Sequence, residues 1–240
     1  MKTGIIVQSR INSTRLYGKI IKKVLNKTIL EHLIERLKKI QFADDICIAF
    51  SDNRSDIKIK KIAEKLNLNY FKGSEYDVLS RHYLAAKKFS YDNIVRISSD
   101  CPLIDPGIID QIILKFNKNK NVDYLSNALV RSFPLGMEAE IFSFKALEFA
   151  YNKAHSPYDR EHVTPYIKNF KNFKKLNLKY KKNLSNYRLT LDTEEDFILI
   201  KKIIEELYPL NINFNLFDII KFIDNDNSLI AINSHIRQIT

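Results

Sequence analysis

The chain has few of the residues that build disulfide, metal or export signals. Its 240 residues include two cysteines, Cys47 and Cys101, which excludes a disulfide framework. No His/Cys pair has the spacing of a zinc site, and we interpret Cys101 as a small packed residue. No apolar run reaches about 18 residues, so no transmembrane helix is expected. The first residues lack the long apolar stretch of a signal peptide, and a cytoplasmic protein is expected.

Glycine is scarce, with five in the whole chain. Neither the Walker pattern G-x-x-x-x-G-K-[ST] nor the dinucleotide fingerprint G-x-G-x-x-G occurs, so a nucleotide site must be built in another way. No repeat and no Gly/Ser linker divides the chain. Its length suits one domain, residues 1–240, with a helical C-terminal extension over about 208–240.

Acidic residues are outnumbered, since 39 Lys and Arg face 28 Asp and Glu, for a formal charge of +11. The basic residues are densest over 168–182, where they alternate with apolar ones as in a half-exposed strand. A nucleic-acid-binding surface and a solvated basic face both fit this pattern. We favour the solvated face, because no helix-turn-helix, zinc-finger or RNA-recognition signature occurs. The positive charge would still attract anionic substrates.

Apolar periodicity predicts an α/β fold. Strand patterns at 5–8, 45–50, 68–71 and 94–97 alternate with helix patterns that begin at Thr28, at 56, at 76 and at Pro106. Further along, we expect strands at 124–126, 138–142, 173–178 and 187–191 and helices at 144–153, 161–169 and 194–207. This alternation predicts a mainly parallel, mixed sheet sandwiched by helices.

Residues 9–19 (SRINSTRLYGK) directly follow the first strand and form the most informative segment. Arg10, Arg15 and Lys19 can converge on a polyanion, and Gly18 allows a tight turn. Hydroxyls and backbone N–H groups of the kind that cradle phosphates come from Ser9, Ser13 and Thr14. A basic surface loop is the alternative, but the position after a first strand favours phosphate binding.

Two aspartates follow predicted strands. Asp100 stands in SSDCP after the strand at 94–97, and Asp192 stands between the strand at 187–191 and a helix capped by Thr193. Carboxylates at strand ends can hold Mg²⁺ together with phosphate oxygens. For Asp100 the alternative is a loop cap that accepts backbone N–H groups. Asp105, just before Pro106, is better explained as a helix cap.

Two further segments are rich in polar residues. In residues 131–140, Glu138 and Glu140 would share one face of a strand and could meet a substrate hydroxyl or a basic partner. In residues 158–165, Arg160, Glu161 and His162 lie together. Taken alone, Arg160 and Glu161 suggest a structural ion pair, and His162 a packed helix residue.

These segments together resemble the spore coat polysaccharide biosynthesis family of cytidylyltransferase-like proteins. More distantly they resemble the synthetases of CMP-activated sialic acids and ketodeoxyoctulosonate. The family pattern R-x-x-S-T-R-L-x-G-K is met at 10–19, with Tyr17 where proline is usual, which makes this loop less rigid. Further matches follow in the same order: Leu30-Glu31-His32, Ser51-Asp52-Asn53, Gly73-Ser74-Glu75, 96–106, 123–127, 133–140, 160–166 and 191–196.

The resemblance implies a nucleotide-diphospho-sugar transferase fold of the GT-A type, CTP as donor, Mg²⁺ as cofactor, pyrophosphate as product and a homodimer. Asp100 and Asp192 would bind the metal, and Arg10, Arg15 and Lys19 would complete the catalytic set. The nucleotide-binding set would be Ser9, Arg10, Ser13, Arg15, Lys19, Ser51, Asp52, Asp77 and Ser99. The acceptor-binding set would be Arg131, Gly136, Glu138, Glu140, Arg160, Glu161 and His162.

We therefore expect transfer of a cytidylyl group from CTP to a sugar, sugar acid or polyol in surface-glycan synthesis. Cationic residues in the acceptor segments favour an anionic acceptor. A catalytically silent sugar-nucleotide-binding protein is the alternative, and a basic nucleic-acid-binding module is a weaker one.

Overall fold

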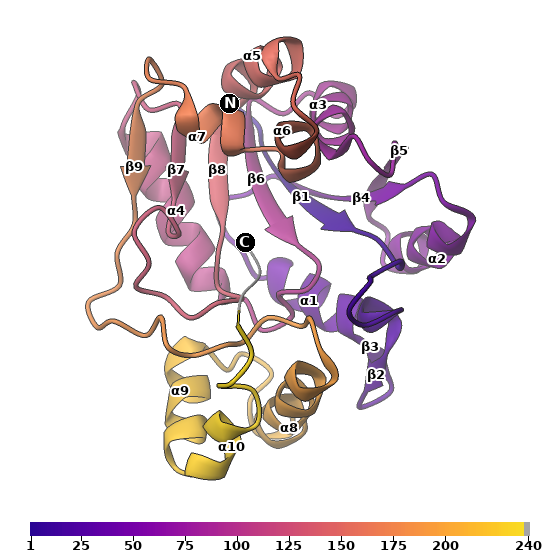
Figure 1. Cartoon of the computed structure of the whole chain (residues 1–240), viewed down its shortest axis with the longest axis vertical. Coiled ribbons are helices and arrows are strands. Elements are labelled where there is room, and N and C mark those ends of the chain that lie inside the picture. Colours follow the sequence, from indigo (N-terminus) through magenta and orange to yellow (C-terminus); the bar gives the residue numbers. More distant parts are fainter. Residues whose placement is uncertain (238–240) are drawn as a thin grey trace.

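A seven-stranded sheet, ordered β5-β4-β1-β6-β8-β7-β9, forms the centre of the computed structural model, which describes residues 1–237 (Figure 1). Strand β8 pairs antiparallel with both of its neighbours, and the other pairings in this sheet are parallel. The strands are β1 (Thr3–Ser9), β4 (Asp45–Ser51), β5 (Asn69–Gly73), β6 (Asn93–Ser98), β7 (Tyr124–Ser126), β8 (Glu140–Ser143) and β9 (Lys175–Asn177). The expected mainly parallel, mixed sheet is confirmed.

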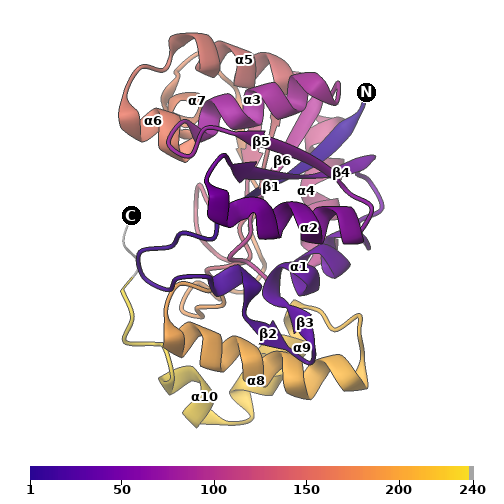
Figure 2. The ribbon, with the colours of Figure 1, turned by 90° about the vertical axis from the view of Figure 1, so that its right-hand side faces the viewer.

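Helices cover both faces of the sheet (Figure 2). One face carries α1 (Ile29–Leu37), α2 (Ile57–Lys65) and α4 (Pro106–Lys118), and the other carries α3 (Val78–Lys88), α5 (Phe144–Lys153) and α7 (Pro165–Asn169). Successive residues of β1 point to opposite faces, so Ile5 and Val7 join one core and Ile6 the other. Because both faces are covered, the central strands β1 and β4 contain continuous apolar runs, at 5–7 and 46–50.

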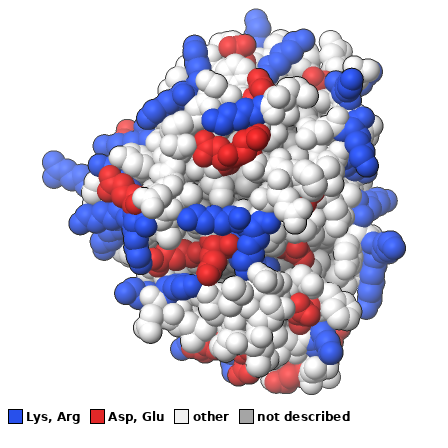
Figure 3. All heavy atoms as spheres, turned by 180° about the vertical axis from the view of Figure 1, so that it is seen from behind, with Lys and Arg blue, Asp and Glu red and all other residues white. Residues whose placement is uncertain are grey.

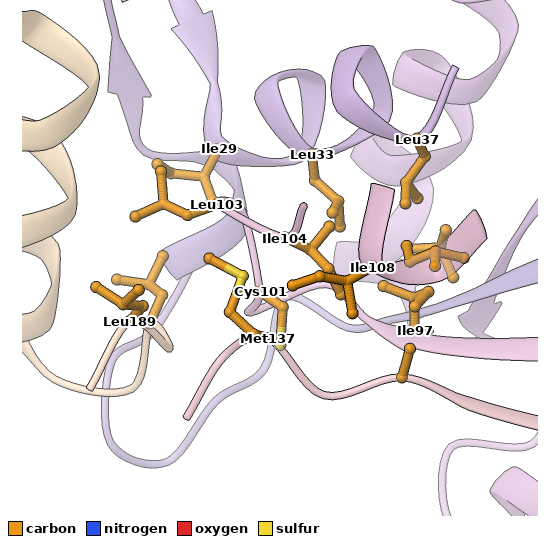
Figure 4. Packing of buried hydrophobic residues seen from close by; sticks show 14 of the residues in the cluster. Ile29, Leu33, Leu37, Ile97, Cys101, Leu103, Ile104, Ile108, Met137 and Leu189 are labelled. Carbon is orange, nitrogen blue, oxygen red and sulfur yellow. The ribbon is translucent and has the colours of Figure 1, made fainter. Parts of the chain in front are cut away.

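The larger core joins the sheet to the loops that carry polar residues. Leu33 of α1, Ile104 of the loop after β6 and Ile108 of α4 pack together, with Cys101 beside Met137 (Figure 4). Cys101 is buried, as expected for a packed residue, and burial raises the pKa of its thiol well above the usual value. Packing of this kind fixes the backbone on either side of Asp100.

The predicted helix caps are confirmed. Thr28 and Glu31 form a reciprocal capping box at the start of α1, and Asp105 accepts a hydrogen bond from Gly107 N at 2.8 Å. Thr193 caps α8 (Glu194–Leu210), where Asp196 completes the box. The acidic residues at the start of α8 therefore include a capping residue, in addition to their favourable position at the helix dipole.

The C-terminal helices lie below the sheet in Figure 1. They are α8, α9 (Leu216–Asp224) and α10 (Asn227–Ala231), and α8 packs against a hairpin formed by β2 (Lys23–Val24) and β3 (Lys27–Thr28). Helices α9 and α10 fall in the range 208–240 expected for a helical extension, of which 238–240 lie outside the described residues.

Two predicted elements differ from the structure. The helix expected over 161–169 is two helices, α6 (Pro157–His162) and α7, separated at Val163, whose φ is +69°. The strand expected over 187–191 forms one bridge, between Leu135 and Arg188, because this segment crosses the end of the sheet instead of extending it. Within residues 1–237, no helix combines the length and apolar character that crossing a membrane requires.

Charge on the face behind that of Figure 1 is mixed. Basic side chains are spread over this face with acidic ones among them (Figure 3). Interspersed charges of both signs are typical of a solvated basic surface. The face shown therefore does not favour the nucleic-acid-binding alternative, which calls for a contiguous basic patch.

Candidate active site

The basic loop after β1 is tied down at both ends. The Asp56 carboxylate, fully buried, accepts a hydrogen bond from Ile11 N at 2.8 Å and one from the Ser51 hydroxyl at 2.6 Å. Gly18 closes the loop with its N–H on the Ile11 carbonyl at 3.1 Å, and its φ of +67° is accessible to glycine without strain. A short 3-10 turn, Lys19–Ile21, then directs the Lys19 side chain inward.

Lys19 joins Asp100 and Asp192, the two aspartates that the sequence analysis assigned to metal binding. Its ammonium lies 3.0 Å from Asp100 Oδ2 and 2.9 Å from Asp192 Oδ1, and its side chain is 9% exposed. Lys19 follows β1 and Asp100 follows its neighbour β6, so both lie at the carboxyl ends of adjacent strands. Asp192 lies in the segment that crosses this end of the sheet, where Leu191 N donates to the Asp100 carbonyl at 2.8 Å. The predicted convergence of the basic loop with Asp100 and Asp192 is present.

Ionisation of this cluster is mutually supported. Burial alone would lower the pKa of Lys19, but the charges of Asp100 and Asp192 outweigh it and raise the pKa. Burial alone would raise the pKa of Asp100, and the Lys19 ammonium outweighs it and lowers the pKa. Lys19 and Asp100 therefore each favour the charged form of the other.

A second layer holds Asp192 in place. Arg15 Nη2 lies 3.0 Å from its Oδ1, and Arg188 Nη2 lies 3.4 Å from its Oδ2. Arg188 also makes a two-point contact with Asp196, with both N–O distances 2.8 Å. Asn233, after α10, donates to Asp196 at 2.9 Å, so the C-terminal segment helps to fix the site.

Two adjoining hollows open beside this cluster. The first hollow, about 120 Å³, is lined by the loop residues Arg10, Ser13, Thr14, Arg15 and Lys19, and by Ser99. The second hollow, about 300 Å³, extends toward β8 and α7. Arg15, Ser98, Asp100 and Asp192 line both hollows, which makes them one cleft with the two carboxylates where they meet.

The segment 131–140 forms part of the second hollow. Glu138 accepts a hydrogen bond from Gly136 N at 2.6 Å and pairs with Arg131 at 3.2 Å. Burial raises the pKa of Glu138, although the Gly136 N–H and Arg131 act against it. Gly136 has a φ of +95°, and a Cβ there would lie 2.5 Å from the Leu189 carbonyl carbon. Its role is therefore steric: it lets this segment lie against residues 188–190.

Several predicted residues are placed elsewhere. Arg160 forms a two-point ion pair with Asp77, which caps α3. Arg160 was predicted to bind the acceptor and Asp77 the nucleotide, but the two residues bind each other. Glu161 and His162 lie on the exposed helix α6, and His162 packs against Tyr158. These residues line neither hollow. The interpretation of Arg160 as half of a structural ion pair holds, with Asp77 as its partner instead of Glu161.

Three residues of the predicted nucleotide-binding set also lie away from the two hollows. The Ser51 hydroxyl is buried and donates to Asp56. Asp52 lines a separate cavity of about 440 Å³ with Phe50 and Tyr70, between β4, β5 and α2. The Ser9 hydroxyl is buried without a hydrogen-bond partner among residues 1–237.

Residues that the sequence analysis did not select complete the site. Arg96 and Lys168 line the second hollow, Arg188 supports Asp192, and Asp56 anchors the basic loop. Arg96 stands in a segment that carried the family resemblance. Lys168 begins the basic stretch that the sequence analysis interpreted as a solvated face. It also lies two residues after the segment 160–166, which matches the family, and this proximity was the one sequence feature that linked Lys168 to the site.

The donor set suits Mg²⁺ bound together with a polyphosphate. Among residues 1–237, no group of three or more His, Cys, Asp or Glu is placed to hold a metal unaided. Asp100 and Asp192 supply two carboxylates that already share one cation. Mg²⁺ is commonly held by one or two carboxylates with water and substrate phosphates. The residues present fit that mode.

The fold and this cleft define an α/β nucleotide-binding protein, and comparison with known proteins gives its family. The cytidylyltransferase family description matches residues 4–218. A solved cytidylyltransferase from Leptospira borgpetersenii is 36% identical, with a TM-score of 0.92 and complete coverage of both chains. The chain belongs to the cytidylyltransferase family, and its activity is CTP-dependent cytidylyl transfer.

Two relatives bear on the wider resemblance. The spore coat polysaccharide biosynthesis protein SpsF of Bacillus subtilis is 30% identical over 84% of this chain and 85% of that protein. A 3-deoxy-manno-octulosonate cytidylyltransferase of Hydrogenovibrio crunogenus is 28% identical over 68% of this chain and 69% of that protein. The resemblance found in the sequence is confirmed.

Proposed function

We propose that the chain transfers the cytidylyl group of CTP to an anionic sugar-type acceptor in the synthesis of a surface glycan. The observation that carries this proposal is the Lys19 ammonium between Asp100 and Asp192, at the junction of the two hollows. The two relatives support different parts of this proposal: one is named for polysaccharide biosynthesis, and the other for a sugar acid.

The first hollow suits the triphosphate. Arg10, Arg15 and Lys19 present three cations there, and Ser13 and Ser99 add polar groups. In the reaction, an acceptor hydroxyl oxygen bonds to the α-phosphorus while the bond from that phosphorus to the bridging oxygen breaks. The pyrophosphate leaves with that oxygen and its electron pair, and the hydroxyl proton passes to solvent. The three cations stabilise the charge that develops on the leaving group.

Asp100 and Asp192 would hold Mg²⁺. When bound, the ion neutralises phosphate charge as a Lewis acid. The chain's own contribution is to orient these carboxylates: Arg188 and Arg15 hold Asp192, and the packed Cys101 and Ile104 fix the loop of Asp100. Such preorganisation limits the rearrangement needed at the moment of reaction.

A screen for pyrophosphate release tests this proposal. CTP, UTP, ATP and GTP are each paired with sugar acids, sugar phosphates and neutral sugars. We expect release with CTP and an acidic acceptor. Binding of CTP without release for any acceptor would instead support a non-catalytic sugar-nucleotide-binding protein, and reaction with neutral acceptors only would refute the anionic acceptor.

A further inference from the structure

Glu140, at the start of β8, is the most heavily satisfied carboxylate beside the second hollow. Its Oε1 accepts from the hydroxyls of Tyr124 at 2.5 Å and Thr164 at 2.9 Å, and lies 2.7 Å from Lys168 Nζ. Its Oε2 accepts from Arg96 Nη1 at 2.6 Å. Burial alone would raise the pKa of Glu140, yet the charges of Arg96 and Lys168 outweigh it and lower the pKa.

A carboxylate with four donors is poorly placed to receive sugar hydroxyls as well. It remains charged, three donors crowd its Oε1, and Arg96 holds its Oε2. Its contacts instead hold two cations against one negative charge. Glu140 therefore organises positive groups at this wall of the cleft, and the earlier assignment of Glu140 to acceptor hydroxyls is replaced.

The cations at this wall exceed the anions they contact. Arg131 is matched one-to-one by Glu138, whereas Arg96 and Lys168 share the single carboxylate of Glu140. Near the aspartates, three cations (Lys19, Arg15 and Arg188) contact three carboxylates (Asp100, Asp192 and Asp196), so the ion pairs at that end are balanced. The local excess of positive charge in the second hollow thus lies beside Glu140.

Both cations retain N–H groups for a ligand. Arg96 directs Nε and Nη2 to Gln8 Oε1 at 3.3 and 3.0 Å and Nη1 to Glu140, which engages three of its five N–H donors. Lys168 has one described acceptor within residues 1–237, Glu140, and its side chain is 35% exposed. Both side chains line the same hollow as Asp100 and Asp192.

We propose that Lys168 and Arg96, held by Glu140, bind the carboxylate or phosphate of the acceptor and thereby determine its anionic class. This inference rests on the proposed function, in which the second hollow receives the acceptor. A negative group of the acceptor would neutralise the one positive charge that Glu140 leaves unmatched. It would be held by charge-assisted hydrogen bonds from Lys168 and Arg96. Lys168 is then the specificity-determining residue, because it is the more exposed of the pair.

The test measures anion binding directly. Ketodeoxyoctulosonate is the carboxylate probe, followed by saturation-transfer NMR, and inorganic phosphate is the phosphate probe, followed by ³¹P line broadening. Galactose serves as the neutral probe. The variants are Lys168→Met, Lys168→Arg and, as a control, Lys171→Met, which changes an exposed lysine that lines neither hollow.

We expect Lys168→Met to weaken binding of at least one anionic probe tenfold or more, with Lys168→Arg keeping most of the affinity. Lys171→Met should match the wild type, and galactose should be indifferent to all three changes. Equal anion affinity in Lys168→Met and wild type, or an equal loss in Lys171→Met, would overturn the inference. The affinity for CTP is measured in the same samples. If the wild type does not bind CTP, the proposed function is refuted, whereas the inference about Lys168 depends only on the anion affinities.

Discussion

The ammonium of Lys19 lies 2.9 Å from the carboxylate of Asp192, although 173 residues separate them in the chain. Asp100 lies on the other side of the same ammonium at 3.0 Å. Lys19 thus occupies the space between the two carboxylates proposed to bind metal. A divalent cation held by both carboxylates would compete with this ammonium, which would then be free to contact phosphate.

Lys19→Met should therefore strengthen metal binding in the absence of nucleotide. The competing charge is gone and both carboxylates remain, so we expect at least a severalfold tighter affinity for Mn²⁺, used as a paramagnetic substitute for Mg²⁺. Electron paramagnetic resonance of free Mn²⁺ measures it. Lys22→Met is the matched control, because Lys22 pairs with Glu194 outside the cleft. Unchanged or weaker Mn²⁺ binding in Lys19→Met would count against a metal site between these carboxylates.

Arg160→Ala should affect stability more than acceptor use. Arg160 holds Asp77 and the carbonyl of Tyr151, which ties α6 to α3 and α5. We expect a loss of about 1–3 kcal/mol in the free energy of unfolding, because partly buried polar groups lose their partner. Thermal or urea unfolding measures the loss, and kinetics give the acceptor KM. A raised KM in an enzyme of wild-type stability would restore Arg160 to the acceptor site.

Gly136→Ala should disrupt the segment that forms the second hollow. Alanine is strained at a φ of +95°, and its Cβ would lie 2.5 Å from Thr190 N. We expect a loss of about 2–5 kcal/mol from backbone strain and overpacking. Urea unfolding checks this loss against Gly107→Ala, a change in the first turn of α4 where φ is not positive. Similar stability of the two variants would contradict the steric role of Gly136.

His82 should make the protein less stable as pH falls. Burial lowers its pKa to about 3 from the ordinary 6.5, so below pH 6.5 the unfolded chain binds a proton that the folded chain does not. The His82 contribution is present above pH 6.5 and is lost as pH falls toward 3, at up to about 1.4 kcal/mol per pH unit. Burial also lowers the pKa of His32, which adds to the same trend.

His82→Leu should therefore show a shallower loss of stability between pH 6.5 and 5, a window above the ordinary pKa of carboxylates. Urea unfolding at several pH values measures the slope, and His155→Gln, at an exposed position, is the control for the removal of one histidine. Parallel curves for His82→Leu and wild type would show that His82 takes up its proton equally in both states.

The centre of the site could be predicted from the sequence because the positions of its residues follow from rules of local structure. Strand β1 and the strand before Asp100 are recognisable apolar runs, and residues at the carboxyl ends of adjacent parallel strands meet. Thr28, Asp105 and Thr193 were identifiable as caps because capping requires particular side chains at fixed positions. These features are sufficient to predict that Lys19 and Asp100 lie at the same edge of the sheet.

The remaining contacts depend on side-chain directions that periodicity does not encode. Val163 adopts a φ of +69°, unusual for a β-branched residue, and ends α6, the helix from which Arg160 contacts Asp77. In the same way, α7 brings Lys168 over Glu140, while the sequence places Lys168 in a run of surface lysines. Long-range pairing, rather than local pattern, decides both cases.

Pyrophosphate release from CTP in the presence of acidic sugars, compared between wild type and Asp100→Asn, tests the central claim most directly. The account predicts release by the wild type, and a loss of about 100-fold or more in kcat for Asp100→Asn, with folding unchanged by circular dichroism. Wild-type turnover in Asp100→Asn at saturating Mg²⁺ would contradict the role of the Asp100 carboxylate. Failure of the wild type to bind CTP by calorimetry with Mg²⁺ present would contradict the account as a whole.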